Sequence, residues 1–183
     1  MDIESNHRYY IAYGSNLDID QMHERLGDLE VIPSFKGYIR KHQLVFRGSR
    51  EDGFFATIIP NTDCCVPVVL YKAVTGLEEI LDRYEGISKE HYYKADFSLN
   101  VEDFKGNQVF TEGFAYIMSK RYNKGIDLPK PMYIKKLIKG YRYYGFDEEY
   151  IKQSIFETGN DLTIFQQAER MLQLEVVEGQ TMH

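Results

Sequence analysis

The sequence contains no tryptophan, only two cysteines and no long hydrophobic run. A helix that spans a membrane needs about 20 consecutive, mostly apolar residues, so we expect no such helix here. Cys64 and Cys65 are adjacent, a spacing that favours neither a disulfide within the pair nor a metal site. Reduced thiols are typical of cytoplasmic proteins, and the acidic, polar start of the sequence does not resemble a secretion signal. We therefore predict a cytoplasmic location.

The sequence also has fewer positively charged than negatively charged residues. The 22 Lys and Arg residues are outnumbered by 28 Asp and Glu residues, which gives a net charge of −6, and the cations are scattered along the chain. Nucleic acids and anionic membranes bind basic patches, so we expect neither as a partner. The five histidines show no metal-ligand spacing, and we expect no metal. The oligomeric state stays open, with a homodimer among the options.

Apolar runs separated by turn residues predict an α+β protein. With 183 residues, the chain is long enough for one domain with its own core. We expect strands at 8–12, 92–99 and 109–118. Several short strands between residues 31 and 71, divided by loops at 48–53 and 60–63, favour a curved sheet or a small barrel.

Capping signals predict where the helices begin and end. Asp18 is expected to cap a helix that runs to about Arg25 and closes at Gly27. Thr75 and Glu78 have the spacing of a capping box for a second helix, which ends at Gly86. A third helix is expected at about 132–144, with Pro131 in its first turn and Gly145 at its end. Further helices are expected at about 147–156 and 161–174, with the last nine residues loose.

The run Tyr13-Gly14-Ser15-Asn16-Leu17 directly follows the first predicted strand. Glycine lets the backbone turn tightly, and Ser and Asn tolerate turn geometry and bond nearby backbone groups. A turn of this kind beside the start of a helix presents N–H groups to an anionic or carbonyl oxygen. We therefore predict that this turn binds a ligand oxygen; a plain connection between strand and helix is the alternative.

A second segment, residues 81–86, places the carboxylate of Glu85 at the end of the second predicted helix. The helix macrodipole disfavours negative charge at that end, which raises the pKa of a carboxyl group. An oxygen-binding turn together with one positioned carboxylate indicates acid/base chemistry on a small polar substrate. Taken alone, a Glu before the Gly that ends a helix is usually a solvated surface residue.

Several motifs, in this order, resemble the gamma-glutamylcyclotransferase family. They are the turn 13–17, Gly53-Phe54-Phe55-Ala56-Thr57-Ile58, Leu81-Asp82-Arg83-Tyr84-Glu85-Gly86, Tyr92 and Pro129-Lys130-Pro131-Met132-Tyr133. The order and spacing agree over roughly residues 8–155. The resemblance implies a small mixed β-barrel with flanking helices over residues 8–156. Residues 1–7 are then a flexible N-terminus, and 157–183 a helical tail with a loose end.

The resemblance also implies the reaction. The α-amine of a gamma-glutamyl amine or peptide attacks its own γ-carbonyl, which releases 5-oxoproline and a free amine or amino acid without any cofactor. By this resemblance Glu85 is the general acid/base. The substrate-binding residues are Tyr13, Gly14, Ser15, Asn16, Leu17, Tyr92 and Tyr133. Lys130 departs from the family, whose members often have Ser there.

Two other functions stay open at this stage. The same pocket on the same fold could serve a binding module that recognises a gamma-glutamyl-like or amino-acid ligand without turning it over. A generic interaction domain would show neither turnover nor selective amino-acid binding. A carboxylate at the position of Glu85 favours the enzyme, because a module that only binds has no need of a general base.

Overall fold

Five strands form a closed, mixed β-barrel in the computed structural model, which describes residues 8–181. The expected flexible segment 1–7 lies outside the described residues. Around the barrel the strands follow the order β1-β3-β2-β4-β5, and β1 and β5 close it as its parallel pair. The strands are β1 (Tyr9–Ala12), β2 (Pro33–Ser49), β3 (Gly53–Lys72), β4 (Tyr92–Asp103) and β5 (Gln108–Met118). The predicted α+β fold with a small mixed barrel is confirmed.

Two long strands replace the short strands expected between residues 31 and 71. β2 and β3 form a hairpin whose tip, between Ser49 and Gly53, is the predicted loop at 48–53. The predicted loop at 60–63 is wrong, because these residues lie inside β3. Pairing shifts there: Arg40 lies opposite Cys65, whereas His42 lies opposite Pro60. Turn-forming residues are thus accommodated as a bulge within a continuous strand.

A glycine lets β2 come close to β4, where the two strands pair over Phe35–Gly37. A Cβ atom at Gly37 would lie 2.9 Å from the Cγ1 atom of Val101. Gly37 therefore permits close packing of two neighbouring strands in the barrel.

Two helices next to the pocket described below begin differently. In α1 (Ile19–Leu26) the Asp18 side chain accepts a hydrogen bond from the Asp20 N–H, and Gly27 ends the helix, as predicted. The predicted capping box of α2 (Leu77–Tyr84) is wrong, because the N-cap is Gly76 and makes no side-chain cap. Gly76 adopts a left-handed turn, so the helix starts one residue late. The Glu78 carboxylate binds Arg8 and Lys94 instead.

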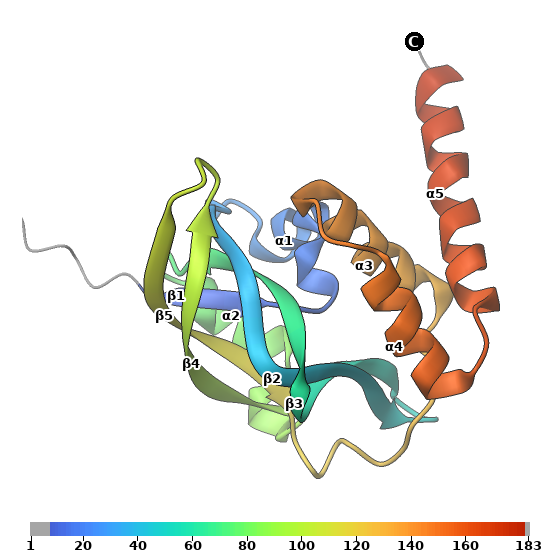
Figure 1. Cartoon of the computed structure of the whole chain (residues 1–183), viewed down its shortest axis with the longest axis horizontal. Helices are drawn as coiled ribbons and strands as arrows, with labels where there is room; N and C mark the ends of the chain where they lie inside the picture. Colours follow the sequence, from blue (N-terminus) through green and yellow to red (C-terminus); the bar gives the residue numbers. More distant parts are fainter. Residues whose placement is uncertain (1–7, 182–183) are drawn as a thin grey trace, which may run out of the picture.

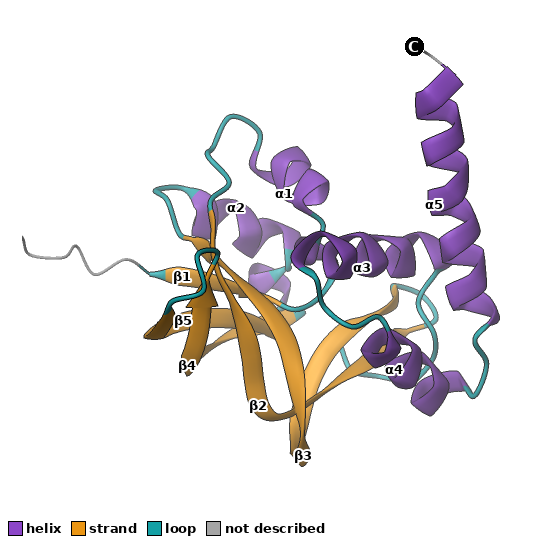
Figure 2. Cartoon of the chain, turned by 45° about the horizontal axis from the view of Figure 1, so that its top comes forward, coloured by secondary structure: helices purple, strands orange, loops and turns teal. Residues whose placement is uncertain are grey.

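Three further helices complete the structure (Figures 1 and 2). α3 (Pro131–Tyr144) has proline in its first turn and ends at Gly145, as predicted. α4 (Glu149–Gly159) contacts β2, and α5 (Thr163–Thr181) packs on α3. Two short 3-10 helices, η1 (Ser15–Leu17) and η2 (Ile87–Lys89), precede α1 and follow α2.

The C-terminal helix is longer than the sequence pattern indicated. The expectation that the last nine residues are loose is wrong for residues 175–181, which are helical, while 182–183 lie outside the described part. Phe165 and Ala168 of α5 are buried against the body. Lys135 of α3 pairs with Glu175, which stabilises α5 beyond its apolar stretch. None of the helices in residues 8–181 is long and apolar enough to cross a membrane.

Candidate active site

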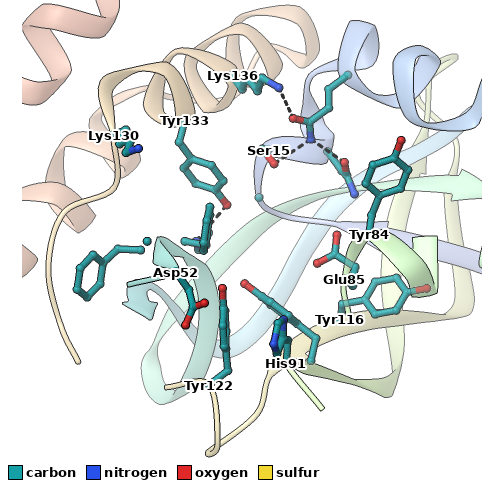
Figure 3. A pocket seen from close by; sticks show the side chains of 18 of the residues that line it. Ser15, Asp52, Tyr84, Glu85, His91, Tyr116, Tyr122, Lys130, Tyr133 and Lys136 are labelled. Atoms are coloured by element: carbon teal, nitrogen blue, oxygen red, sulfur yellow. Dashed lines mark hydrogen bonds between the residues drawn. The ribbon is translucent and has the colours of Figure 1, made fainter. Parts of the chain in front are cut away.

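A pocket of about 580 Å³ lies where the turn after β1, the tip of the β2–β3 hairpin, the end of α2 and the start of α3 meet (Figure 3). β4 and β5 contribute aromatic side chains to its wall. Of the sequence-predicted site residues, Tyr13, Gly14, Ser15, Asn16, Glu85, Tyr92 and Tyr133 all line this pocket. Segments more than 100 residues apart in the sequence are therefore brought together around one cavity.

Glu85 is held at the C-cap of α2 and points into the pocket (Figure 3). Its backbone N–H bonds to the carbonyl of Leu81, and the αL residue Gly86 turns the chain away after it. The Glu85 side chain is 17% exposed, and its Oε1 lies 3.1 Å from Nη1 of Arg25. Burial raises the pKa of the Glu85 carboxyl above its ordinary value, and the charge of Arg25 works against that rise. A carboxylate with a raised pKa in a cleft is suited to exchange protons.

Tyrosines surround this carboxylate. Burial raises the pKa of Tyr10, Tyr13, Tyr92 and Tyr133, and the negative charge of Glu85 adds to each of these shifts. Their hydroxyls therefore stay protonated at neutral pH. Tyr13 donates its proton to the backbone carbonyl of Tyr116, whereas the other three hydroxyls can donate inside the pocket. The wall around Glu85 consequently offers neutral donors and apolar ring faces, which desolvate the carboxylate.

The turn presents some of its groups to the pocket and uses others to hold its own shape. The N–H groups of Leu17 and Asp18 bond to the carbonyls of Gly14 and Ser15, both at 3.0 Å. The Leu17 side chain is fully buried and lies outside the pocket lining, against Gly140 of α3. Leu17 thus supports the turn from below, whereas Gly14, Ser15 and Asn16 line the cavity.

A chain of polar contacts, which the sequence analysis missed, holds the turn in place (Figure 3). Lys136 of α3 donates to Oε1 of Gln21 at 2.5 Å. Nε2 of Gln21 lies 2.9 Å from the Ser15 hydroxyl oxygen and 2.8 Å from Oδ1 of Asn16. The Asn16 amide in turn donates to the Tyr10 hydroxyl at 2.8 Å. This network fixes the side chains of Ser15 and Asn16 from α1 and α3.

The spacing of Gln21 and Arg25 in the sequence is a signal that both belong to the site. They are four residues apart on α1 and so lie on the same face of the helix. That face carries polar groups toward the pocket, while Met22 and Leu26 are buried in the core. Two long polar side chains at this spacing, just after an oxygen-binding turn, indicate a helix face that turns toward the site.

Comparison with known proteins gives a match to one family model and to several solved structures that share the fold of this chain. A model of the AIG2-like family matches residues 65–153. A gamma-glutamyl cyclotransferase structure matches with a TM-score of 0.61 and 23% identity, over 81% of this chain and 86% of that one. YkqA from Bacillus subtilis matches with a TM-score of 0.65 and 20% identity, over 85% of this chain and 56% of that one. Comparison with curated protein sequences gives no significant match.

The chain has the gamma-glutamylcyclotransferase-like fold. The resemblance drawn from the sequence motifs is confirmed for the fold, and the AIG2-like match over residues 65–153 agrees with it. A yeast gamma-glutamyl cyclotransferase specific to glutathione has the same fold, with a TM-score of 0.51, 14% identity and 85% of this chain covered. At such identities the likeness establishes the fold, and the reaction has to be argued from the site.

The pocket is lined by both positively and negatively charged side chains. Lys130, the position where the sequence departs from the family motif, lines the pocket at the start of α3, and Arg50 and Asp52 line it from the hairpin tip. Tyr122 stacks on His91 with ring centroids 4.2 Å apart. Within residues 8–181 no cluster of His, Cys, Asp or Glu side chains is arranged to hold a metal ion.

Proposed function

We propose that the protein cyclises a gamma-glutamyl amine or peptide to 5-oxoproline and releases the amine or amino acid. The observation that carries this proposal is Glu85: one largely buried carboxylate, with a raised pKa, in a pocket shared with the turn at 13–16. The fold is that of a gamma-glutamyl cyclotransferase. A cytoplasmic location belongs to the same proposal.

Glu85 would act first as a base and then as an acid. At neutral pH the α-amine of the substrate is protonated and cannot attack. Glu85 accepts one proton from it, and the neutral amine nitrogen bonds to the γ-carbonyl carbon. Glu85 then returns that proton to the leaving nitrogen as its bond to the carbon breaks. The ring nitrogen loses its second proton to the departing amine, which leaves as its ammonium ion. One carboxylate can perform both transfers when its pKa lies nearer to the working pH than that of an ordinary Glu.

Oxygen atoms of the substrate would bind at the turn and at the tyrosines. The Tyr133 hydroxyl accepts the Ala56 N–H at 3.0 Å, which leaves its own proton to donate into the pocket. The Tyr10 hydroxyl is likewise left with its own proton to donate, because its oxygen accepts an N–H of the Asn16 side-chain amide. Donors fixed in this way stabilise negative charge on an oxygen without reorganising during the reaction. We assign Tyr133 to substrate binding on this basis, and Gly14, Ser15, Asn16 and Tyr92 because they line the same pocket.

A panel of gamma-glutamyl amines and peptides tests the proposal, with 5-oxoproline, glutamate and the free amine all measured. We expect 5-oxoproline and amine in equal amounts from unblocked substrates. N-acetylated substrates should bind without turnover, because an amide nitrogen is too poor a nucleophile to close the ring. Release of glutamate or N-acetylglutamate would contradict cyclisation and indicate hydrolysis. Saturable binding without any product would instead support the binding module.

A further inference from the structure

Arg25 and Glu85 form an ion pair in which both side chains are mostly buried. It joins the last turn of α1 to the C-cap of α2 at 3.1 Å, and the two side chains are 21% and 17% exposed. The neighbouring pair of Arg83 and Glu79 is 71% and 74% exposed. Exposed pairs contribute little to stability, whereas a pair removed from water controls the charge of its members strongly.

The position of Arg25 is fixed on two sides. Its guanidinium carbon lies 4.8 Å from the centroid of the Tyr84 ring, a cation–π contact. On α1 it is one turn after Gln21, whose side chain is held by Ser15, Asn16 and Lys136. The guanidinium therefore approaches Glu85 from a defined direction.

The pairing uses one oxygen of the carboxylate. Arg25 bonds to Oε1 of Glu85, and within residues 8–181 Oε2 has no hydrogen-bond partner. Glu85 also lines the pocket. A carboxylate held by one oxygen keeps the other available for a proton from the substrate.

We propose that Arg25 is a positioning residue for the reaction: it orients Glu85 through Oε1 and keeps that carboxylate ionised in a buried site, with Oε2 directed to the substrate amine. This inference rests on the proposed function. It differs from a role in substrate binding, in which Arg25 would pair with a carboxylate of the substrate and lose its contact with Glu85.

The other groups around Glu85 do not supply this charge. Of the groups that act on the pKa of Glu85, Arg25 is the one that lowers it. Tyr10, Tyr13, Tyr92, Tyr116 and Tyr133 face the site as neutral hydroxyls with raised pKa values. The other charged or titratable side chains that line the pocket are Arg50, Glu51, Asp52, Tyr84, His91, Tyr122, Lys130 and Lys136.

A direct titration tests the proposal without any assumption about turnover. The Glu85 side-chain carboxyl is followed by carbon-13 NMR in the full-length protein, with its signal assigned by its absence in Glu85→Gln. We expect the titration midpoint to move to higher pH in Arg25→Gln and to lie between the two in Arg25→Lys. Arg83→Gln is the matched control, since it removes an Arg–Glu pair that is open to solvent, and should leave the midpoint unchanged.

Kinetics add a second readout if a gamma-glutamyl substrate turns over. In Arg25→Gln, the acid limb of the kcat/KM profile should move to higher pH, with a loss of about tenfold at the acidic end and little change in KM. An unchanged Glu85 titration in folded Arg25→Gln would overturn the proposal, as would a large rise in KM with an unmoved acid limb. If Arg25→Gln does not fold, an unmoved titration midpoint in Arg25→Lys has the same consequence. Absence of turnover would count against the proposed function alone.

Discussion

The hydroxyl oxygen of Tyr133 lies 3.0 Å from the backbone nitrogen of Ala56, whose N–H it accepts. This bond joins the first turn of α3 to β3 across the pocket. The same oxygen lies close to the turn after β1, because a Cβ atom at Gly14 would be 3.1 Å from it. The Tyr133 ring also meets Phe55 edge-on, with centroids 5.5 Å apart. Tyr133 thus holds three segments of the site at fixed spacing.

Replacement of Tyr133 by Phe removes that acceptor and keeps the ring. The Ala56 N–H is then left unpaired at a buried position, so we expect a loss of about 1–3 kcal/mol in the free energy of unfolding. Urea denaturation measures it. Tyr143→Phe, at a side chain that is 63% exposed, is the control and should stay near wild type. Equal stability of the two variants would show that this hydrogen bond contributes nothing.

Glu85→Gln should retain the fold and lose turnover. The amide cannot accept the proton from the substrate amine, and loss of a general acid/base typically lowers the rate by about 10²–10⁴. The release of 5-oxoproline is measured beside a thermal melt. Glu79→Gln is the matched control, because Glu79 lies on the same helix with its side chain in solvent. Wild-type rates in Glu85→Gln would remove Glu85 from the mechanism.

The raised pKa of Glu85 also predicts how stability depends on pH. Since the folded state holds the Glu85 proton more tightly than the unfolded state, this group lowers stability as the pH rises from the unfolded pKa through the raised one. Glu85→Gln has no such proton to lose. Its melting temperature relative to wild type should therefore increase over a pH range that begins at about 4, near the ordinary pKa of Glu. A difference that is constant over this range would show that the Glu85 pKa is the same in the folded and unfolded states.

Gly140→Ala should displace the turn at residues 13–17 through its contact with Leu17. A Cβ atom at Gly140 would lie 2.4 Å from the Cβ atom of Leu17 and 2.8 Å from its carbonyl oxygen. Such overpacking costs about 1–3 kcal/mol, which exceeds the gain of about 1 kcal/mol from replacing a helical Gly by Ala. Calorimetry measures the loss, and any activity should fall with it. At Gly125 the nearest contact would be 3.6 Å, so Gly125→Ala should be tolerated.

The sequence alone determined the parts of the structure that depend on near neighbours. The Asp18 cap, proline in the first turn of α3 and the Gly145 stop were all predicted, because capping is decided within a few residues. The ordered motifs also predicted the fold. Seven of the eight predicted site residues line one pocket, and the eighth, Leu17, lies in the core beneath it.

Only the tertiary structure decided what depends on distant parts of the chain. The bulge in β3 follows from pairing with β2, which keeps residues 60–63 in the strand despite their turn propensity. Arg25 reaches Glu85, Gln21 reaches Ser15 and Lys136 reaches Gln21 because the barrel sets α1, α2 and α3 side by side. No local pattern records such contacts, since a long polar side chain looks the same in the sequence whether it meets solvent or a buried carboxylate. The charge state of Glu85 is likewise a property of the assembled pocket, in which burial and one guanidinium act in opposite directions.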